Sequence, residues 1–286
     1  MRIAVLGARG QLGAAVVHEL SAAHDVRPCT RSDLDVTDDA AVAAAIGRVT
    51  PDVVINCTAY NEVDRSEDRP VEALNANAFA VRALARAASA AGGVLVHYST
   101  DFVFDGMASE PYSEDDRPNP RSVYGASKLL GEWFAGDAPH AYVLRVESLF
   151  GRAPGGPASK GSVAMIVESI RAGRDVRVFE DRTISPTFII DAAQATRALV
   201  EQQAAPGVYH CVNSGSCTWL EFAGEAARIL GKAAQLVPVR AAETKMRAER
   251  PRFCALSNDK LRAAGVAMPP WQDALARYVS SLPTAL

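Results

Sequence analysis

The chain has 286 residues, a formal net charge of -3 at pH 7 and 49% hydrophobic residues. This is the composition of an ordinary globular protein, and the near-neutral charge gives no argument for binding nucleic acid or a membrane surface. No apolar run approaches the roughly 20 residues of a membrane span, and the first residues lack the pattern of a secretory signal. The five cysteines are scattered without a C-x-x-C pair, which suits a reducing compartment and argues against a zinc or disulfide framework. We therefore expect a cytoplasmic protein with no metal site and no nucleic-acid or membrane partner.

Strands and helices are predicted to alternate along the first half of the chain. Apolar, partly β-branched runs predict strands at Ile3–Leu6, Asp25–Cys29, Asp52–Cys57, Val94–Tyr98 and Ala141–Glu147. Helices are predicted at Gln11–Ala22, from Pro70 to about Ala91, and at Ser122–Phe134. Such alternation is typical of a parallel sheet with helices on both faces, which is an α/β fold.

A glycine-rich loop, Gly7-Ala-Arg-Gly-Gln-Leu-Gly13, lies between the first strand and the first helix. Glycines at this point let the backbone turn tightly, approach a pyrophosphate and pack the helix on the sheet, and the helix N-terminus offers N–H groups to the phosphates. The spacing is G-x-x-G-x-x-G, which by itself also fits a turn with no ligand. The position of the loop favours a dinucleotide site formed by Gly7, Gly10, Gln11, Leu12 and Gly13.

The second strand ends in Thr30-Arg31, where a dinucleotide without a 2′-phosphate usually meets an acidic residue. An arginine here, with Arg9 inside the glycine loop, favours NADPH, although both side chains would also fit a solvated surface and NADH stays open. Further cofactor contacts are expected after the second and third strands, at Asp35, Val36, Ala59 and Tyr60.

Regular alternation stops after Phe150, where residues 151–161 are rich in glycine and proline. Helices are predicted at Ser162–Ala172, Ile189–Gln202 and Thr218–Leu230, and strands at Val176–Phe179 and Val208–Val212. We divide the chain into a dinucleotide-binding domain over residues 1–150 and a smaller, mainly substrate-binding lobe over residues 151–286. Whether the helix over residues 189–202 returns to the first domain is left open.

Three side chains of the first domain are typical of carbonyl chemistry. Thr100 follows the fourth strand, and Tyr124 and Lys128 lie four residues apart on one face of a helix. A phenol with a pKa of about 10 is a poor acid near pH 7, and we expect the Lys128 ammonium to lower the pKa of Tyr124. With a nicotinamide as hydride source, the three side chains could polarise and protonate a carbonyl, which predicts an oxidoreductase. The alternative is a buried tyrosine beside a surface lysine.

In this order, the glycine loop, Thr100 and the Tyr124/Lys128 pair resemble the extended short-chain dehydrogenase/reductase superfamily. More narrowly, the chain resembles the dTDP-4-dehydrorhamnose reductase family, above all in Tyr98-Ser-Thr-Asp-Phe-Val-Phe-Asp-Gly106 and Trp271-Gln-Asp-Ala-Leu275. The resemblance covers nearly the whole chain. It implies a Rossmann-type doubly wound parallel sheet with a smaller C-terminal substrate lobe, and it leaves a homodimer open, because some members are dimers.

The resemblance also implies a reaction and a set of contacts. Reduced nicotinamide would deliver hydride to the C4 ketone of a dTDP-linked 6-deoxy sugar, most simply dTDP-4-dehydrorhamnose, giving dTDP-L-rhamnose for surface polysaccharide. Tyr124 would protonate the alkoxide, Thr100 would hydrogen-bond the carbonyl, and Lys128 would hold the nicotinamide ribose. Cofactor contacts would also come from Ser99, Tyr124 and Lys128. Substrate contacts would come from Thr100, Asp101, Phe102, Tyr124, Leu149 and Arg250.

Three stretches depart from the family's motifs. The family's Arg-x-Ser-Trp-x-(Tyr/Phe)-Gly corresponds to Arg145-Val-Glu-Ser-Leu-Phe-Gly151, and we expect Leu149 in place of the tryptophan that lines the sugar site. The family's Asp-Gln-x-Gly-x-Pro-Thr becomes Asp181-Arg-Thr-Ile-Ser-Pro-Thr187, and Cys254 replaces a usual serine. These departures leave the reduction intact and the identity of the sugar open.

Other functions on the same fold stay open. Dehydratases of the superfamily tend to have Thr-Asp-Glu, whereas Phe102 stands at the position of the second acid here, which counts against dehydration. A nucleotide-sugar epimerase or a different ketoreductase remains an alternative. So does a non-catalytic NADP-binding protein that resembles the regulatory subunit of methionine adenosyltransferase, which need not keep the catalytic set.

Overall fold

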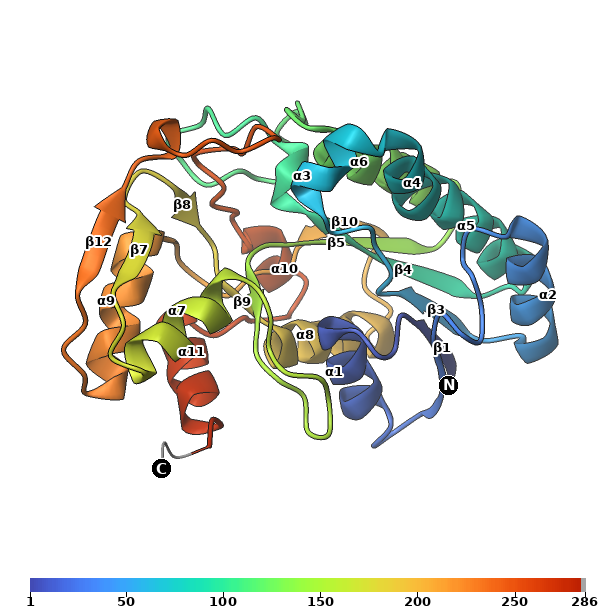
Figure 1. Cartoon of the computed structure of the whole chain (residues 1–286). Coiled ribbons are helices and arrows are strands. Elements are labelled where there is room, and N and C mark those ends of the chain that lie inside the picture. Colours follow the sequence, from blue (N-terminus) through green and yellow to red (C-terminus); the bar gives the residue numbers. More distant parts are fainter. Residues whose placement is uncertain (284–286) are drawn as a thin grey trace.

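The computed structural model describes residues 1–283, and a parallel sheet forms its centre (Figure 1). Six strands pair in the order β10-β5-β4-β3-β1-β2, all in parallel. They are β1 (Arg2–Leu6), β2 (Asp25–Cys29), β3 (Val53–Asn56), β4 (Val94–Thr100), β5 (Ala141–Val146) and β10 (Gly207–His210). The fold class predicted from the alternation of strands and helices is confirmed.

Helices cover both faces of the sheet, which explains why its central strands are apolar along their length. All four residues of β3 are buried. One face packs against α1 (Gln11–Leu20) and α8 (Ile189–Glu201). The other face packs against α2 (Asp39–Val49), α5 (Ala80–Ala90) and the end of α6 (Val123–Ala135).

A second hydrophobic core lies in the C-terminal part of the chain, and the helices that form it lie beside the sheet (Figure 1). It joins α7 (Ser162–Arg171), α9 (Trp219–Leu230) and α11 (Trp271–Ser280) to β7 (Val176–Phe179), which pairs in parallel with β12 (Leu236–Val239). Short elements complete this part: β6 (Leu149–Phe150), β8 (Thr183–Ile184), β9 (Thr187–Phe188), β11 (Cys217–Thr218), and α10 (Asp259–Ala263) beside β10.

After α7 and β7, which belong to the second core, the chain packs on the sheet again. Helix α8 packs along α1, and β10 pairs with β5 at the edge of the sheet. The helix that the sequence left open therefore packs on the first domain, and the strand predicted in the smaller lobe extends the main sheet. The domain boundary at residue 150 stays a prediction.

The long helix predicted from Pro70 to Ala91 is not a regular α-helix. It consists of α4 (Pro70–Leu74), a π-helical turn η1 (Asn75–Phe79) and α5. The buried Asn77 lies in this turn, and its side chain exchanges hydrogen bonds with the backbone N–H and C=O of Tyr60 and donates to Ser127 Oγ. The π turn thus places the side-chain amide of Asn77 where it can bond both the loop at Tyr60 and helix α6. Short helix α3 (Val63–Asp68) precedes it.

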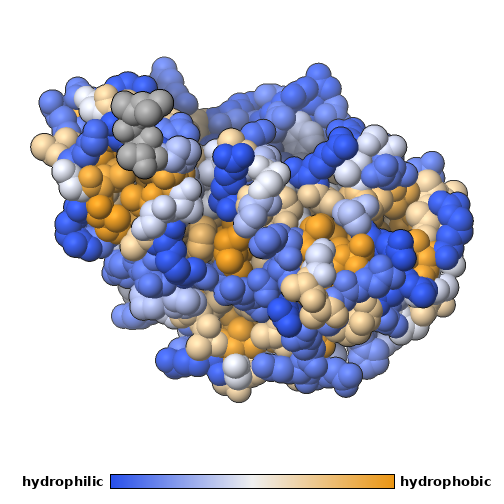
Figure 2. All heavy atoms as spheres, turned by 90° about the horizontal axis from the view of Figure 1, so that it is seen from below, coloured by the Kyte–Doolittle hydropathy of each residue, from blue (hydrophilic) through white to orange (hydrophobic). Residues whose placement is uncertain are grey.

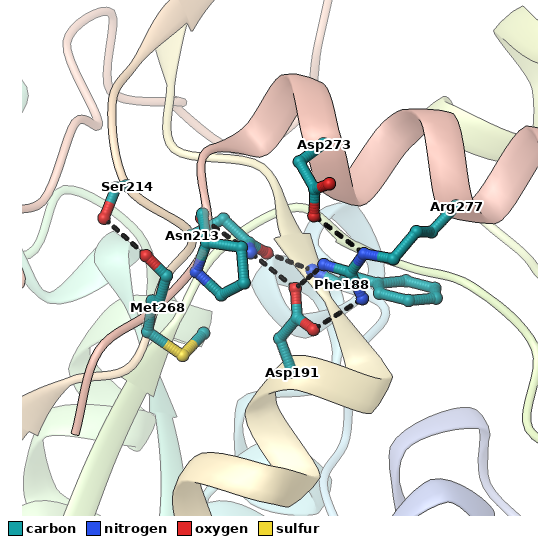
Figure 3. Close-up of polar contacts among 8 residues, drawn as sticks. Phe188, Asp191, Asn213, Ser214, Met268, Asp273 and Arg277 are labelled. Atoms are coloured by element: carbon teal, nitrogen blue, oxygen red, sulfur yellow. Dashed lines mark hydrogen bonds and ion pairs between the residues drawn. The ribbon is translucent and has the colours of Figure 1, made fainter.

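A buried carboxylate connects the two parts of the molecule (Figure 3). Asp191, at the start of α8, accepts two hydrogen bonds from Arg277 of α11, at 2.7 and 2.8 Å, and one from Asn213 Nδ2. Asn213 Oδ1 accepts from the backbone N–H of Phe188. One side chain therefore links the sheet domain, the segment after β10 and the last helix.

The face of the molecule in Figure 2 is mostly hydrophilic, and its apolar side chains lie in several separate groups. Among residues 1–283, no helix is both long and apolar enough to cross a bilayer.

A buried ion pair holds α6 against the sheet. Glu132 of α6 accepts hydrogen bonds from Arg145 of β5 at 2.7 and 2.9 Å and from Ser99 Oγ of β4. Both charged side chains are only 4% exposed. Such a pair fixes geometry, because losing one partner leaves the other charge buried and uncompensated.

We expect Glu132→Ala to lower the free energy of unfolding by about 3 kcal/mol or more, because Arg145 would then be a buried, unpaired cation. Urea unfolding measures the change. Arg262→Ala removes a surface pair with Asp259 in which both side chains are 71% exposed, and it should cost less than about 1 kcal/mol. Equal effects of the two substitutions would contradict the structural role given to Glu132.

Candidate active site

Two adjoining clefts open where β1, β3, β4 and β5 end, the edge at which ligands bind in open parallel sheets. One, of about 750 Å³, follows the ends of β1, β2 and β3. The other, of about 690 Å³, lies between the end of β4, helix α6 and residues of the C-terminal part. Arg9, Gly10 and Ala59 line both clefts, so the two form one continuous surface.

The glycine loop brings the start of α1 to these clefts. Gly7 has a φ of 75°, which favours glycine, and a Cβ on Gly13 would lie 2.2 Å from the Gly7 carbonyl oxygen. No side chain caps the N-terminus of α1 at Gly10. The loop and helix therefore present backbone N–H groups suited to a pyrophosphate. Gly7, Gly10, Gln11 and Leu12 line the clefts, whereas Gly13 does not line either one and serves close packing.

The other predicted cofactor residues of the first domain lie where expected. The 750 Å³ cleft is lined by Arg31, Asp35, Val36, Ala59 and Tyr60. The side chain of Gln11 is engaged elsewhere, because its amide contacts Gly151 O and the backbone N–H of Lys160 and so holds the loop after β6. The residues present thus fit a dinucleotide: an uncapped helix start for the phosphates, and Arg9 and Arg31 at the ribose end.

Thr100, Tyr124 and Lys128 converge on the 690 Å³ cleft, together with Ser99. All three are buried, and the ring of Phe102 packs edge-on against Tyr124 with centroids 5.5 Å apart. Lys128 Nζ donates to the Tyr98 carbonyl oxygen at 2.6 Å and lies 3.4 Å from His97 Nε2. The arrangement can present a phenol, a hydroxyl and an amine to one substrate atom.

The expected effect of Lys128 on Tyr124 is wrong for this structure. The pKa of Tyr124 is raised, because the phenol is buried and because the charge of Asp101 opposes its ionisation; only the neighbouring Thr100 hydroxyl acts the other way. Burial also lowers the pKa of Lys128 to about 8, although Glu132 opposes this shift. Tyr124 therefore keeps its proton at neutral pH.

Thr100 is oriented by the residue that follows it. Its Oγ1 donates a hydrogen bond of 2.8 Å to Asp101 Oδ1. A hydroxyl has a single proton, so this bond must be released or reversed before Thr100 donates to a carbonyl. The protonation of Asp101 therefore bears directly on what Thr100 can do.

Sequence reasoning missed a buried polar cluster at this point. Asp101, Glu147 and Cys254 each place one ligand-type atom within 4.8 Å of the other two, and Arg182 lines the same cleft. Burial raises the pKa of Asp101 to about 6, and burial with the charge of Asp101 raises the pKa of Glu147 further. The one feature of the sequence that could have indicated this cluster is Glu147, a charged residue at the end of an apolar strand. The absence of a metal site stays a prediction.

Arg250, predicted to bind the substrate, lines the cleft but is already paired. Its two terminal nitrogens donate to both oxygens of Asp64, at 2.7 and 2.8 Å, and one also contacts Ala248 O. The pairing lowers the pKa of Asp64 to about 2. A phosphate contact by Arg250 stays a prediction and would compete with Asp64.

The expectation for Leu149 needs a correction of position. Counted from Arg145, the tryptophan of the family's motif corresponds to Ser148, and Leu149 corresponds to the variable residue after it. Both residues line the cleft, and Ser148 has a φ of 42°, unusual for a residue other than glycine. The departure from the family's motif that bears on the sugar site is therefore a serine at position 148 in place of tryptophan.

The parallel sheet, the glycine loop and the Thr-Tyr-Lys set define an oxidoreductase of the short-chain dehydrogenase/reductase class. The family described as "RmlD substrate binding domain" matches residues 1–283. The chain is 36% identical to a dTDP-4-dehydrorhamnose reductase of Streptomyces griseus, covering 97% of this chain and 93% of that one. The chain therefore belongs to the dTDP-4-dehydrorhamnose reductase family, as its motifs predicted.

Two further relatives bear on cofactor and substrate. The crystal structure of a dTDP-4-dehydrorhamnose reductase from Bacillus anthracis in complex with NADP is 31% identical, has a TM-score of 0.92, and covers 98% of this chain and 99% of that one. A protein of Streptomyces antibioticus, named a probable dTDP-4,6-dihydroxy-2-methyloxan-3-one 4-ketoreductase, is 36% identical over 96% of this chain and 93% of its own length.

The pKa of Asp101 predicts a pH-dependent stability. An unfolded aspartate ionises near pH 3.9, whereas folded Asp101 ionises near pH 6. The folded state therefore binds more protons across this window, and stability falls as pH rises through it. We expect Asp101→Asn to raise the melting temperature more at pH 8 than at pH 5. Asp259→Asn, on the surface, is the matched control; a pH-independent effect of Asp101→Asn would contradict the assignment.

Proposed function

We propose that this protein reduces the C4 ketone of a dTDP-linked 6-deoxy sugar with NADPH, most simply dTDP-4-dehydrorhamnose to dTDP-L-rhamnose. The observation that carries the proposal is the convergence of Thr100, Tyr124 and Lys128 on a cleft continuous with the glycine-loop cleft. Family membership supports the substrate class. The expected setting is the cytoplasm, and a homodimer stays open.

When bound, the reduced nicotinamide supplies the hydride that forms the new C–H bond at the ketone carbon. Tyr124 gives its proton to the ketone oxygen as charge develops there, which completes the alcohol. Its raised pKa keeps the proton in place until an alkoxide, a far stronger base, forms beside it. Lys128 sits one helical turn away and binds the ribose side of the cofactor, and Thr100 orients the carbonyl.

Arg31 and Arg9 support NADPH over NADH. Both line the 750 Å³ cleft at the end of β2, where a 2′-phosphate would need a positive charge. The NADP complex of the Bacillus anthracis relative supports the same choice. NADH stays the second candidate.

A ketoreductase acting on another deoxy sugar is the second candidate function. The Streptomyces antibioticus relative carries such a name at the same identity as the Streptomyces griseus reductase. The short side chain of Ser148 and the charged Arg182 in the cleft favour a substrate pocket different from that of the family's motif. An epimerase or a regulatory NADP-binding protein would leave nicotinamide absorbance unchanged.

A coupled assay tests the proposal. dTDP-4-keto-L-rhamnose is generated enzymatically from dTDP-glucose, the protein is added, and nicotinamide absorbance is followed with NADPH and NADH in separate reactions. We expect oxidation that yields dTDP-L-rhamnose and is faster with NADPH. Cofactor binding without oxidation would reject this substrate and leave a different keto sugar or a regulatory role.

Tyr124→Phe should keep the fold and cofactor binding and lose turnover by about 100-fold or more, because the proton donor is removed. NADPH fluorescence titration measures binding, and the coupled assay measures turnover. Tyr112→Phe, which removes the hydroxyl of a tyrosine outside the Thr100, Tyr124 and Lys128 set, is the matched control. Unchanged turnover in Tyr124→Phe would remove Tyr124 as the acid.

A further inference from the structure

The polar cluster of Asp101, Glu147 and Arg182 has free bonding capacity directed at the cleft. All three side chains are buried and line the 690 Å³ cleft beside Thr100. They come from three places in the chain: the end of β4, the end of β5 and the turn before β8. None of them supplies the hydride or the proton in the steps derived above.

The two acids lack partners for part of their bonding capacity. Asp101 Oδ1 accepts from Thr100, whereas Asp101 Oδ2 is buried without any hydrogen-bond partner among residues 1–283. One Glu147 oxygen accepts from the backbone N–H of Ser185. A buried carboxylate oxygen without a partner costs free energy, so a donor from a bound ligand is strongly favoured there.

Arg182 has a similar surplus of donors. Its Nε donates to Pro251 O at 3.2 Å, and its guanidinium carbon lies 5.4 Å from the centroid of the Phe179 ring. Within residues 1–283 the bond from Nε is its one side-chain hydrogen bond, and its charge acts on Asp101 and Glu147 from beyond ion-pair distance. The side chain is only 8% exposed, and it lines the cleft.

The place of the cluster indicates which part of a substrate it would meet. Thr100 is assigned to the reacting carbonyl, and Asp101 is the next residue and is bonded to it. In a keto sugar, a hydroxyl on the neighbouring ring carbon lies beside the carbonyl oxygen. A hydroxyl both donates and accepts, so it can satisfy an acid and a guanidinium together.

We propose that Asp101, Glu147 and Arg182 form a specificity subsite that hydrogen-bonds the hydroxyl group on the ring carbon next to the reacting ketone. This inference rests on the proposed function. One of the two acids accepts the single proton of the hydroxyl, and the outer N–H groups of Arg182 donate to the hydroxyl oxygen. A sugar without that hydroxyl leaves buried polar groups unpaired and is rejected. The positive charge of Arg182 beside the acids favours a neutral ligand group over a cation.

The test compares two ligands in four proteins. The ligands are dTDP-L-rhamnose and its 3-deoxy counterpart, and calorimetric titration gives the ratio of their dissociation constants. We expect wild-type protein to bind the hydroxylated ligand at least about tenfold more tightly. Glu147→Ala should reduce this ratio to near one, and Glu147→Gln, which keeps an accepting oxygen, should restore most of it. Glu180→Ala, an acid of the same lobe paired with Arg240, should keep the wild-type ratio.

A second variant guards against a folding defect. If Glu147→Ala unfolds, Arg182→Met keeps the apolar stem and removes the donors, and it should also bring the ratio toward one. Equal binding of the two ligands by wild-type protein would overturn the subsite, and so would an equal loss of both ligands in the variants. The ratio is read from binding. Absent reduction in the coupled assay would therefore reject the proposed function without deciding the subsite.

Discussion

The buried ion pair between Glu132 and Arg145 is the contact on which the geometry of the site depends. It joins α6 to β5, and through Ser99 it also joins α6 to β4. A neighbouring side of α6 is fixed by close packing, because a Cβ on Gly131 would lie 2.1 Å from the Asn77 carbonyl oxygen. Tyr124 and Lys128 occupy this helix, so their positions relative to Thr100 follow from one charge pair and one close approach.

The site concentrates ionisable groups in a place where burial opposes their charged forms. The shifts run in the directions that burial requires: the pKa of Tyr124, Asp101 and Glu147 is raised, and the pKa of Lys128 is lowered. Burying such groups costs stability, and the apolar cores on both faces of the sheet offset it. As a result, Tyr124 keeps its proton at neutral pH, as a group that protonates a carbonyl oxygen must.

Much of the site could be predicted because local signals carry it. The glycine loop precedes a helix, Thr100 ends an apolar strand, and Tyr124 and Lys128 share a helix face. The π turn could not be predicted, because it depends on hydrogen bonds of Asn77 with Tyr60 and Ser127, which are distant in sequence. The pairing of β10 with the main sheet was missed, because the sequence of a short apolar strand does not indicate which strand it pairs with.

The polar cluster escaped prediction for a related reason. Asp101, Glu147, Arg182 and Cys254 are separated by dozens of residues, and only the folded chain brings them together. Three of them stand where the sequence departs from the family's motifs. Each departure looked like an isolated change, whereas in space they are neighbours around one carboxylate. Substitutions at these positions are therefore expected to depend on one another.

The way the chain passes between its two cores bears on how this protein could acquire a new substrate. Residues of the second core both precede and follow α8 and β10, and residues near α10 pack again on the sheet side. The substrate lobe is therefore not a contiguous module that recombination could exchange between relatives. Several chain connections also restrain it from swinging as one rigid body about a single hinge. New specificity on this scaffold must arise by replacing individual side chains in the cleft.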